Sequence, residues 1–242
     1  MAEATLQWLN EGDPAIRWQV ERDLLDRRPR TWRATRAAVE REGWGRRLLD
    51  EQDVGGTWGN GLYTPKWTST TYTLLLLRRL GLPSSNERAL AGSRRLLDDA
   101  MWIDGGVSYW ASHSYAERCV NGMVLAICSH FDGSDRRTDS IAELLVGAAM
   151  PDGGWNCEDV RGATHSSFHT TVSVLEGLLE WKRSTGAYDA DAAIARGHKF
   201  MLGHRMYRSH RTDQVINDAW TTFHFPPRWH YDVLRGLDHL RD

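Results

Sequence analysis

Several features that would assign this chain to a class of protein are scarce or missing. Three cysteines in 242 residues are too few for a disulfide framework. The longest strongly apolar run, Tyr72–Leu77, is far too short to span a bilayer. The first ten residues, MAEATLQWLN, lack the basic start and apolar stretch of a secretion signal. We therefore predict a cytoplasmic protein without a transmembrane segment.

Charge of one sign is not in excess either. Thirty Lys and Arg residues stand against 32 Asp and Glu residues, and the net charge is −2. A dedicated nucleic-acid-binding protein depends on a surplus of positive charge, so we predict no nucleic-acid partner. The chain also lacks the Gly-x-Ser-x-Gly, Gly-Lys-Ser/Thr and Gly-x-Gly-x-x-Gly motifs. These absences argue against the hydrolases, phosphate-loop proteins and dinucleotide-binding proteins that carry them.

Tryptophan and a Gly-Gly repeat are what the sequence does contain. Twelve tryptophans indicate a large aromatic core or an aromatic-lined cavity. Gly-Gly pairs recur about every fifty residues, each closely followed by an aromatic residue, at Gly55–Gly56, Gly105–Gly106 and Gly153–Gly154. Each pair precedes an apolar segment that we expect to form a buried helix, at 68–82, 119–131 and 169–181. A fourth such segment, 230–240, has no Gly-Gly pair.

One-sided amphipathic segments alternate with these apolar ones. Residues 86–101 and 141–150 place their apolar residues at helical spacing on one face. Such helices pack outside the buried ones, and strand signals are weak throughout. We therefore predict an all-α protein with one domain, 1–242. Residues 1–44 form N-terminal helices, and residues 45–242 form helical-hairpin repeats.

The repeat resembles that of a known superfamily. QDVGGTWG (52–59) and PDGGWN (151–156) resemble the QW-type repeats of squalene–hopene cyclases, oxidosqualene cyclases and protein prenyltransferase β-subunits. The resemblance covers residues 45–240 and implies an α/α toroid with inner and outer helices around a cavity for an apolar molecule. Four inner helices are fewer than the closed toroids of this superfamily use. The ring is then open, completed by a second copy or a partner chain, or closed by the N-terminal helices around 13–27.

Four potential metal ligands fall near the starts of the expected inner helices. An alignment of these helices puts Ser69, Cys119 and His169 in one slot, with His230 two positions later and Cys157 in the preceding turn. In a toroid these starts face one end of the cavity, so Cys119, Cys157, His169 and His230 would converge. Two thiolates and two imidazoles suit tetrahedral zinc. The prenyltransferases hold zinc there with Asp, Cys and His, although their Asp-x-Cys order is not matched at Cys157-Glu158-Asp159. The alternative is that the cysteines fill the core and the histidines are satisfied by hydrogen bonds.

The resemblance also implies acid chemistry, but the family motif is missing. Squalene–hopene cyclases protonate their substrate with Asp-x-Asp-Asp, and no such motif occurs here. Our catalytic candidates are Asp159, Asp232 and His165, the last being also an alternative ligand on the face of His169. A carboxyl group beside aromatic surface in a closed cavity gains a raised pKa and can act as a general acid. Surface solvation for Asp159, and a core pairing of Asp232 with His230 or Arg235, are the alternatives.

Aromatic residues cluster at the turns and inner-helix starts. Cyclases use such rings to stabilise carbocations, so seven residues become substrate-binding candidates. They are Trp58, Trp67, Tyr72, Trp110, Trp155, Phe168 and Trp229. The alternative is that these rings wedge the repeats together, above all Trp58 and Trp155. The expected function is an enzyme that binds an apolar, isoprenoid-like small molecule and performs cyclisation or group transfer. A zinc–thiolate enzyme of another reaction and a non-catalytic binding or scaffold protein are the two rivals.

Overall fold

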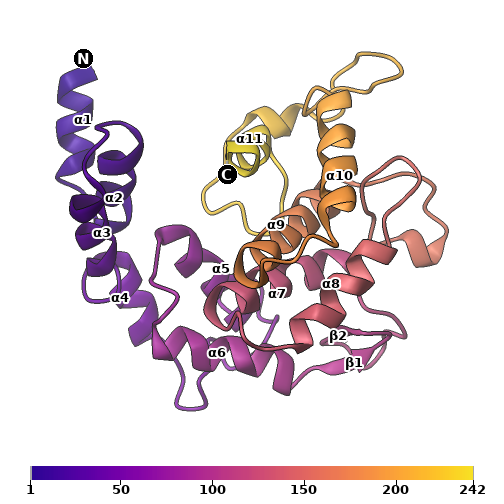
Figure 1. Ribbon diagram of the computed structural model, residues 1–242, viewed down its shortest axis with the longest axis horizontal. Helices are drawn as coiled ribbons and strands as arrows, with labels where there is room; N and C mark the ends of the chain where they lie inside the picture. The colour runs from indigo at the N-terminus through magenta and orange to yellow at the C-terminus, as the bar shows by residue number, and fades with distance from the viewer. Residues whose placement is uncertain (1, 242) are drawn as a thin grey trace. The chain divides into compact units, whose positions relative to one another are not determined.

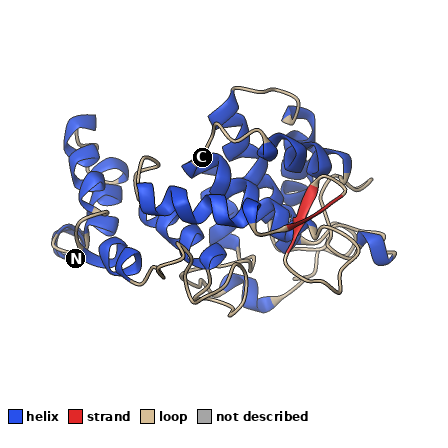
Figure 2. Cartoon of the chain, turned by 90° about the horizontal axis from the view of Figure 1, so that it is seen from below, coloured by secondary structure: helices blue, strands red, loops and turns tan. Residues whose placement is uncertain are grey.

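The computed structural model describes residues 2–241 and confirms the all-α prediction, with one short two-stranded hairpin as its only named sheet in that range (Figure 2). The chain divides into two compact units, residues 1–95 and 96–242. The single domain inferred from the sequence stays a prediction. Within residues 2–241, no helix has both the length and the apolar character that crossing a membrane requires.

The first unit carries the N-terminal helices and the first repeat. It contains α1 (Ala2–Asn10), α2 (Pro14–Asp23), α3 (Pro29–Ala38), α4 (Gly43–Asp50), α5 (Thr70–Leu80) and most of α6 (Glu87–Asp98) (Figure 1). Asp13 caps α2 by accepting the Ala15 N–H at 2.9 Å, and Pro14 starts the helix. The indole N–H of Trp18 donates to the Leu80 carbonyl at 2.9 Å. This bond ties the N-terminal helices to the end of α5.

The second unit contains the remaining repeats. Its elements are β1 (Met101–Ile103), β2 (Gly106–Ser108), α7 (Arg118–Phe131), α8 (Arg137–Gly147), η1 (Asp159–Arg161), α9 (Phe168–Thr185), α10 (Asp191–Gly203), η2 (Asp218–Thr221) and α11 (Val233–Arg241). The two strands are antiparallel around the second Gly-Gly turn, and Trp102 lies opposite Val107. Figure 1 shows α7 and α9 side by side, in agreement with their extensive contact.

The contact between α7 and α9 is close enough to need glycine on both helices. A side-chain carbon at Gly122 would lie 2.5 Å from the Ser173 carbonyl oxygen. One at Gly177 would lie 2.5 Å from the Gly122 carbonyl oxygen. The two backbones therefore touch, and α7 is buried on nearly every side, as the apolar composition of segment 119–131 predicts.

The last segment differs from the expected inner helix. α11 begins at Val233, three residues after His230, and only Arg235, Gly236 and His239 are buried along it. Leu234 and Leu237 are about half exposed. The fourth copy is therefore a short, one-sided helix, whose buried face carries Arg235 and His239 rather than its leucines.

One hydrogen bond recurs in all three Gly-Gly repeats. A residue one or two positions after the Gly-Gly pair donates its backbone N–H. The acceptor is a polar side chain near the start of the following inner helix. The three bonds join Trp58 to Thr70 (3.1 Å), Val107 to Asn121 (2.8 Å) and Trp155 to Thr171 (3.0 Å). The repeat inferred from the sequence is thus reproduced in the internal geometry of both units.

These bonds also bear on the alignment of the repeats. Cys119 and His169 each lie two residues before the acceptor, so they share a slot as predicted. In the first repeat, counting back from the acceptor Thr70 gives Thr68, whereas counting from the start of α5 gives Thr71. The two counts differ, because a continuous apolar run carries no register, and the slot of Ser69 stays a prediction.

Candidate functional site

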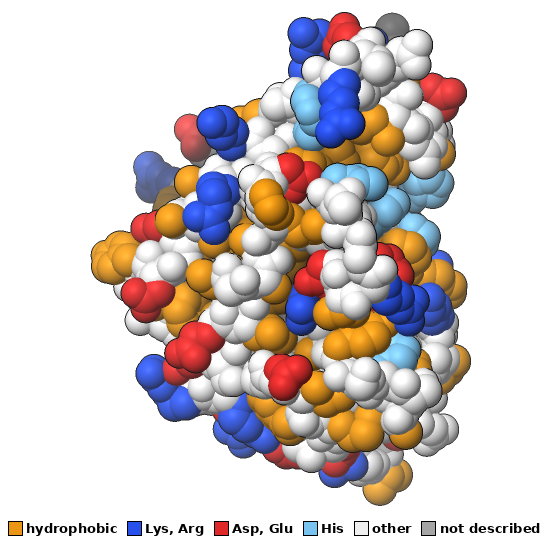
Figure 3. Space-filling model, turned by 90° about the vertical axis from the view of Figure 1, so that its right-hand side faces the viewer, with side chains coloured by type: hydrophobic (Ala, Val, Ile, Leu, Met, Phe, Trp, Pro, Cys, Tyr) orange, Lys and Arg blue, Asp and Glu red, His pale blue; other side chains and the backbone are white. Residues whose placement is uncertain are grey.

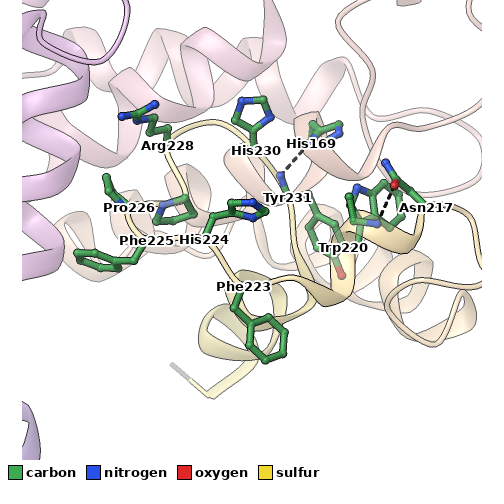
Figure 4. A pocket seen from close by; sticks show the side chains of 12 residues that line it. His169, Asn217, Trp220, Phe223, His224, Phe225, Pro226, Arg228, His230 and Tyr231 are labelled. Carbon is green, nitrogen blue, oxygen red and sulfur yellow. Dashed lines mark hydrogen bonds between the residues drawn. The ribbon is translucent and has the colours of Figure 1, made fainter.

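A pocket of about 620 Å³ opens in the second unit between the start of α9 and the segment before α11 (Figure 4). α9 supplies one residue, and a single stretch of chain supplies the rest. The lining comprises His169, Asn217, Ala219, Trp220, Phe223, His224, Phe225, Pro226, Pro227, Arg228, His230 and Tyr231. None of these residues is acidic. The pocket therefore combines aromatic surface with cationic or hydrogen-bond-donating groups, and its volume is typical of small-molecule sites.

His169 is the best-defined polar group of the pocket. It is the second residue of α9, and its Nδ1 accepts the backbone N–H of Tyr231 at 2.7 Å. In the neutral ring the proton is then assigned to Nε2. Burial, together with the neighbouring positive charges of His230 and Arg235, lowers the pKa of His169 to about 4. At neutral pH this imidazole is uncharged and presents an N–H donor.

This geometry predicts an unusual titration. We expect the ring resonances of His169, followed by NMR and assigned through a His169→Gln variant, to titrate with a midpoint near pH 4 rather than 6.5. Between these two pH values the unfolded chain binds a proton that the folded imidazole does not. Protonation therefore favours unfolding, and this contribution to stability is lost as the pH falls from about 6.5 to about 4. A midpoint near 6.5 would contradict the buried, hydrogen-bonded placement of the ring.

A buried ion pair joins α9 to α11, the two helices that adjoin the pocket residues. The Arg235 guanidinium donates to both carboxylate oxygens of Glu176 in α9, each at 2.9 Å. It also donates to the His230 carbonyl at 2.9 Å and to the Ser173 hydroxyl at 3.2 Å. Arg235 is 3% exposed and Glu176 8%. The pair thus fixes the backbone at His230 relative to α9.

Asp232 completes this support. One carboxylate oxygen accepts the Arg235 N–H at 2.8 Å and so caps α11, and the other accepts the His224 N–H at 3.2 Å. Asp232 is buried, and the partner proposed for it in Arg235 is found, although through the backbone. Both oxygens are engaged by backbone donors, so the structure gives Asp232 a positioning role. Its role as a general acid stays a prediction.

The segment that lines the pocket has a constrained backbone at one cationic residue. Arg228 adopts φ 55°, a left-handed conformation that costs energy for a residue with a side chain. In Figure 4 the side chains of His230 and His169 lie at one edge of the group and that of His224 near its middle, whereas the Phe223 ring points away from it. Phe223 and Phe225 are largely exposed. Figure 3 shows several histidine side chains gathered on one face of the molecule.

The two cysteines that the sequence analysis singled out lie together near the start of α9. The Cys157 sulfur accepts the backbone N–H of Cys119 at 3.1 Å and the hydroxyl of Thr170 at 3.5 Å. A hydrogen bond from the Cys119 thiol is the main cause that lowers the pKa of Cys157. The same bond and burial raise the pKa of Cys119. The third cysteine, Cys128, is fully buried in α7, and burial raises the pKa of its thiol.

The four predicted zinc ligands form two pairs. The Cys119 backbone N–H donates to the Cys157 sulfur at 3.1 Å, and the rings of His169 and His230 lie with their centroids 5.9 Å apart. Over residues 2–241 the structure contains no group of three or more His, Cys, Asp or Glu side chains arranged to hold a metal. The zinc site stays a prediction. The two cysteines lie together and the two histidines lie together, but the four residues do not form one group.

The other two catalytic candidates lie outside the pocket lining. Asp159, in η1, forms an ion pair with Arg118 at 3.0 Å and so anchors η1 to the start of α7. His165 is exposed, and its carbonyl oxygen accepts the Asn156 amide at 2.8 Å. Neither residue touches the twelve that line the pocket through any hydrogen bond the structure shows in its described part. Their catalytic roles remain untested predictions.

The seven aromatic candidates are distributed over both units, and none of them lines the pocket. In the first unit Trp67 and Tyr63 pack against Tyr72, with centroids 5.0 Å and 5.2 Å from it. Trp110 packs on His113 in the second unit, at 5.0 Å. These three candidates, Trp67, Tyr72 and Trp110, form local aromatic contacts.

Two candidates pack against residues that line the pocket. Phe168 is buried against Trp220 and Tyr231, with centroids 4.9 Å from both. Trp229 stacks on His230 at 4.0 Å. The remaining two, Trp58 and Trp155, are fully buried, and each indole N–H donates to a backbone carbonyl, Leu48 and Leu145 respectively, at 2.6 Å. Burial and these bonds favour the wedge role predicted as their alternative.

Sequence reasoning found His169 and His230 but missed most of the pocket. The missing residues belong to one stretch, NDAWTTFHFPPRWHYD (217–232), in which aromatic, histidine and proline residues are dense. That density was the available signal. No family model, no curated protein and no solved structure matches this chain. The chemistry of the pocket therefore follows from its own residues.

Proposed function

We propose that this chain is an enzyme of the terpenoid cyclase and prenyltransferase type, and that its pocket binds an isoprenoid diphosphate. The observation that carries the proposal is the pocket lining, in which Arg228 and three histidines accompany aromatic rings and no carboxylate. Donors of this kind stabilise an anionic head group, and the rings contact an apolar chain. The recurring turn-to-helix hydrogen bond supports the kinship, and the proposal includes the α/α toroid.

The lining favours group transfer over proton-initiated cyclisation. Protonation of an alkene needs a free carboxylic acid, whereas both oxygens of the nearby Asp232 accept backbone N–H groups. An allylic diphosphate instead ionises by breaking its C–O bond, and the electron pair stays on the leaving oxygen. Arg228 and the neutral His169 N–H donor are available to different oxygens of the diphosphate, and Trp220 and Tyr231 offer ring faces to the allylic cation. The cation then loses a proton or is captured by a nucleophile.

The proposal predicts a selective loss of binding. We expect Arg228→Gln to weaken binding of farnesyl diphosphate about 10- to 100-fold, because it removes one charge-assisted hydrogen-bonding group from the head-group site. Farnesol, which lacks the anion, should bind wild type and variant equally. Isothermal titration calorimetry with both compounds and with inorganic diphosphate measures the difference.

The matched control is Arg183→Gln, which removes a partly exposed arginine in the last turn of α9, outside the pocket lining. It should leave all three affinities unchanged. If Arg228→Gln and wild type bound farnesyl diphosphate with equal affinity, the assignment of the head-group site would be wrong. Release of inorganic diphosphate during incubation separates an enzyme from a binding protein, because binding without release supports the non-catalytic alternative.

A further inference from the structure

The Cys157 sulfur is surrounded by donors from the starts of two helices. Cys119 is the second residue of α7, and its N–H is one of the groups that a helix start leaves without a partner inside the helix. Thr170 is the third residue of α9. Two donors on one sulfur favour a thiolate, and two helix starts add their positive dipole ends.

The backbone nitrogen of Cys119 lies 3.1 Å from the Cys157 sulfur, so the two cysteines are direct neighbours. Both cysteines are half-buried, so neither is sealed in the core. Cys157 stands in the segment between Trp155 and η1, with the exposed Glu158 next to it. The Arg118–Asp159 ion pair keeps this segment beside the start of α7. The two thiols are therefore held together by surrounding structure rather than by chance approach of two mobile chains.

We propose that Cys119 and Cys157 are a redox-active dithiol, which hydroperoxides oxidise to a disulfide and small thiols reduce again. The Cys157 thiolate attacks one peroxide oxygen, so that an S–O bond forms, the O–O bond breaks and hydroxide leaves. The Cys119 sulfur, losing its proton, then attacks the Cys157 sulfur. The S–S bond forms, the S–O bond breaks, and the second oxygen leaves as water. Overall, two thiols lose two hydrogen atoms, and one hydrogen peroxide becomes two waters.

This chemistry is distinct from the proposed transfer reaction and uses none of the pocket residues. The chain carries its own internal control in Cys128, which is fully buried in the middle of α7 and has no access to an oxidant. Two adjacent threonines supply a second control. The Thr170 hydroxyl donates to the Cys157 sulfur, whereas the Thr171 hydroxyl donates to the Trp155 carbonyl.

The experiment is peptide mapping by mass spectrometry of the reduced full-length chain after exposure to hydrogen peroxide. We expect a Cys119–Cys157 cross-linked peptide pair that has lost two hydrogen atoms, in wild type and equally in Cys128→Ala. Cys119→Ser should stop at a Cys157 sulfenic acid, trapped by a cyclic 1,3-dione. Thr170→Val should slow cross-linking about threefold to tenfold, the effect of one lost hydrogen bond. Circular dichroism checks that each variant is folded.

Three results would overturn the proposal. One is equal oxidation of Cys128 in the folded protein. Another is over-oxidation of Cys157 to the sulfonic acid without any cross-link. The third is one zinc per purified wild-type chain, measured by elemental mass spectrometry and lost in both Cys119→Ser and Cys157→Ser, because the thiols would then be metal ligands.

Discussion

Replacing Arg235 with alanine should lower the free energy of unfolding by about 3–5 kcal/mol, the cost of breaking a buried ion pair from one side. The substitution leaves the Glu176 carboxylate without its two guanidinium hydrogen bonds in a site that water barely reaches. It also releases the His230 carbonyl and the Ser173 hydroxyl. Urea unfolding followed by tryptophan fluorescence and circular dichroism measures the loss.

A double substitution shows whether the cost comes from the orphaned charge. In Arg235→Met with Glu176→Leu no charge remains in the core, and apolar replacements of buried ion pairs are often neutral. We therefore expect the double variant to regain most of the stability that Arg235→Ala loses. The surface substitution Arg183→Ala should change stability by less than about 0.5 kcal/mol. A loss below about 1 kcal/mol for Arg235→Ala would show that solvent screens the pair, as it does at protein surfaces.

The same ion pair explains why the pocket could not be predicted from local sequence. Glu176 and Arg235 are 59 residues apart, and nothing near either residue in the sequence indicates the other. The sequence pattern placed Asp232 inside an apolar helix, whereas the residue lies just before α11 and caps it. A capping aspartate and a catalytic one look alike in sequence, because the distinction lies in which backbone N–H groups reach the carboxylate.

The repeat, by contrast, was readable because its signals are local. Each Gly-Gly turn, each apolar helix and the polar residue at the start of that helix fall within a short stretch of chain. The alternative offered for Trp58 and Trp155 as wedges rested on the same local logic, and both indoles are buried as it requires. The slot of Ser69 is not fixed in this way, because the leucine run of α5 offers several equivalent alignments.

The convergence of Cys119 and Cys157 lies between these cases. Their placement at inner-helix starts followed from the repeat, and the structure does bring the two residues together. Their assembly with His169 and His230 into one four-ligand set required the positions of two more segments. The histidines instead meet each other beside Tyr231, whose N–H occupies Nδ1 of His169. Repeat logic predicts which slot a residue fills, but not the direction of its side chain.

Replacing Trp155 with alanine should cost about 3–5 kcal/mol, the range for removing a fully buried aromatic side chain. The ring is 0% exposed and lies against Gly197 of α10, where an added side-chain carbon would come within 2.9 Å of it. Its indole N–H bonds to the Leu145 carbonyl of α8 at 2.6 Å. Trp155 therefore joins α8, α9 and α10, and Trp58 shows the matching contacts with Gly92, Leu48 and Thr70.

A milder change separates this wedge role from the substrate-binding role that the sequence analysis assigned to Trp155. Trp155→Phe keeps an aromatic face but removes the N–H group, so the Leu145 carbonyl loses its partner in a dry site. For a wedge, we expect Trp155→Phe to lower the urea midpoint and Trp155→Ala to lower it further. The affinity of the folded variants for farnesyl diphosphate should stay unchanged. For a substrate-contacting ring, Trp155→Phe would instead leave the midpoint near wild type and weaken binding. Full burial of the ring among three helices leads us to expect the first result, because a ligand can reach a ring only where solvent can.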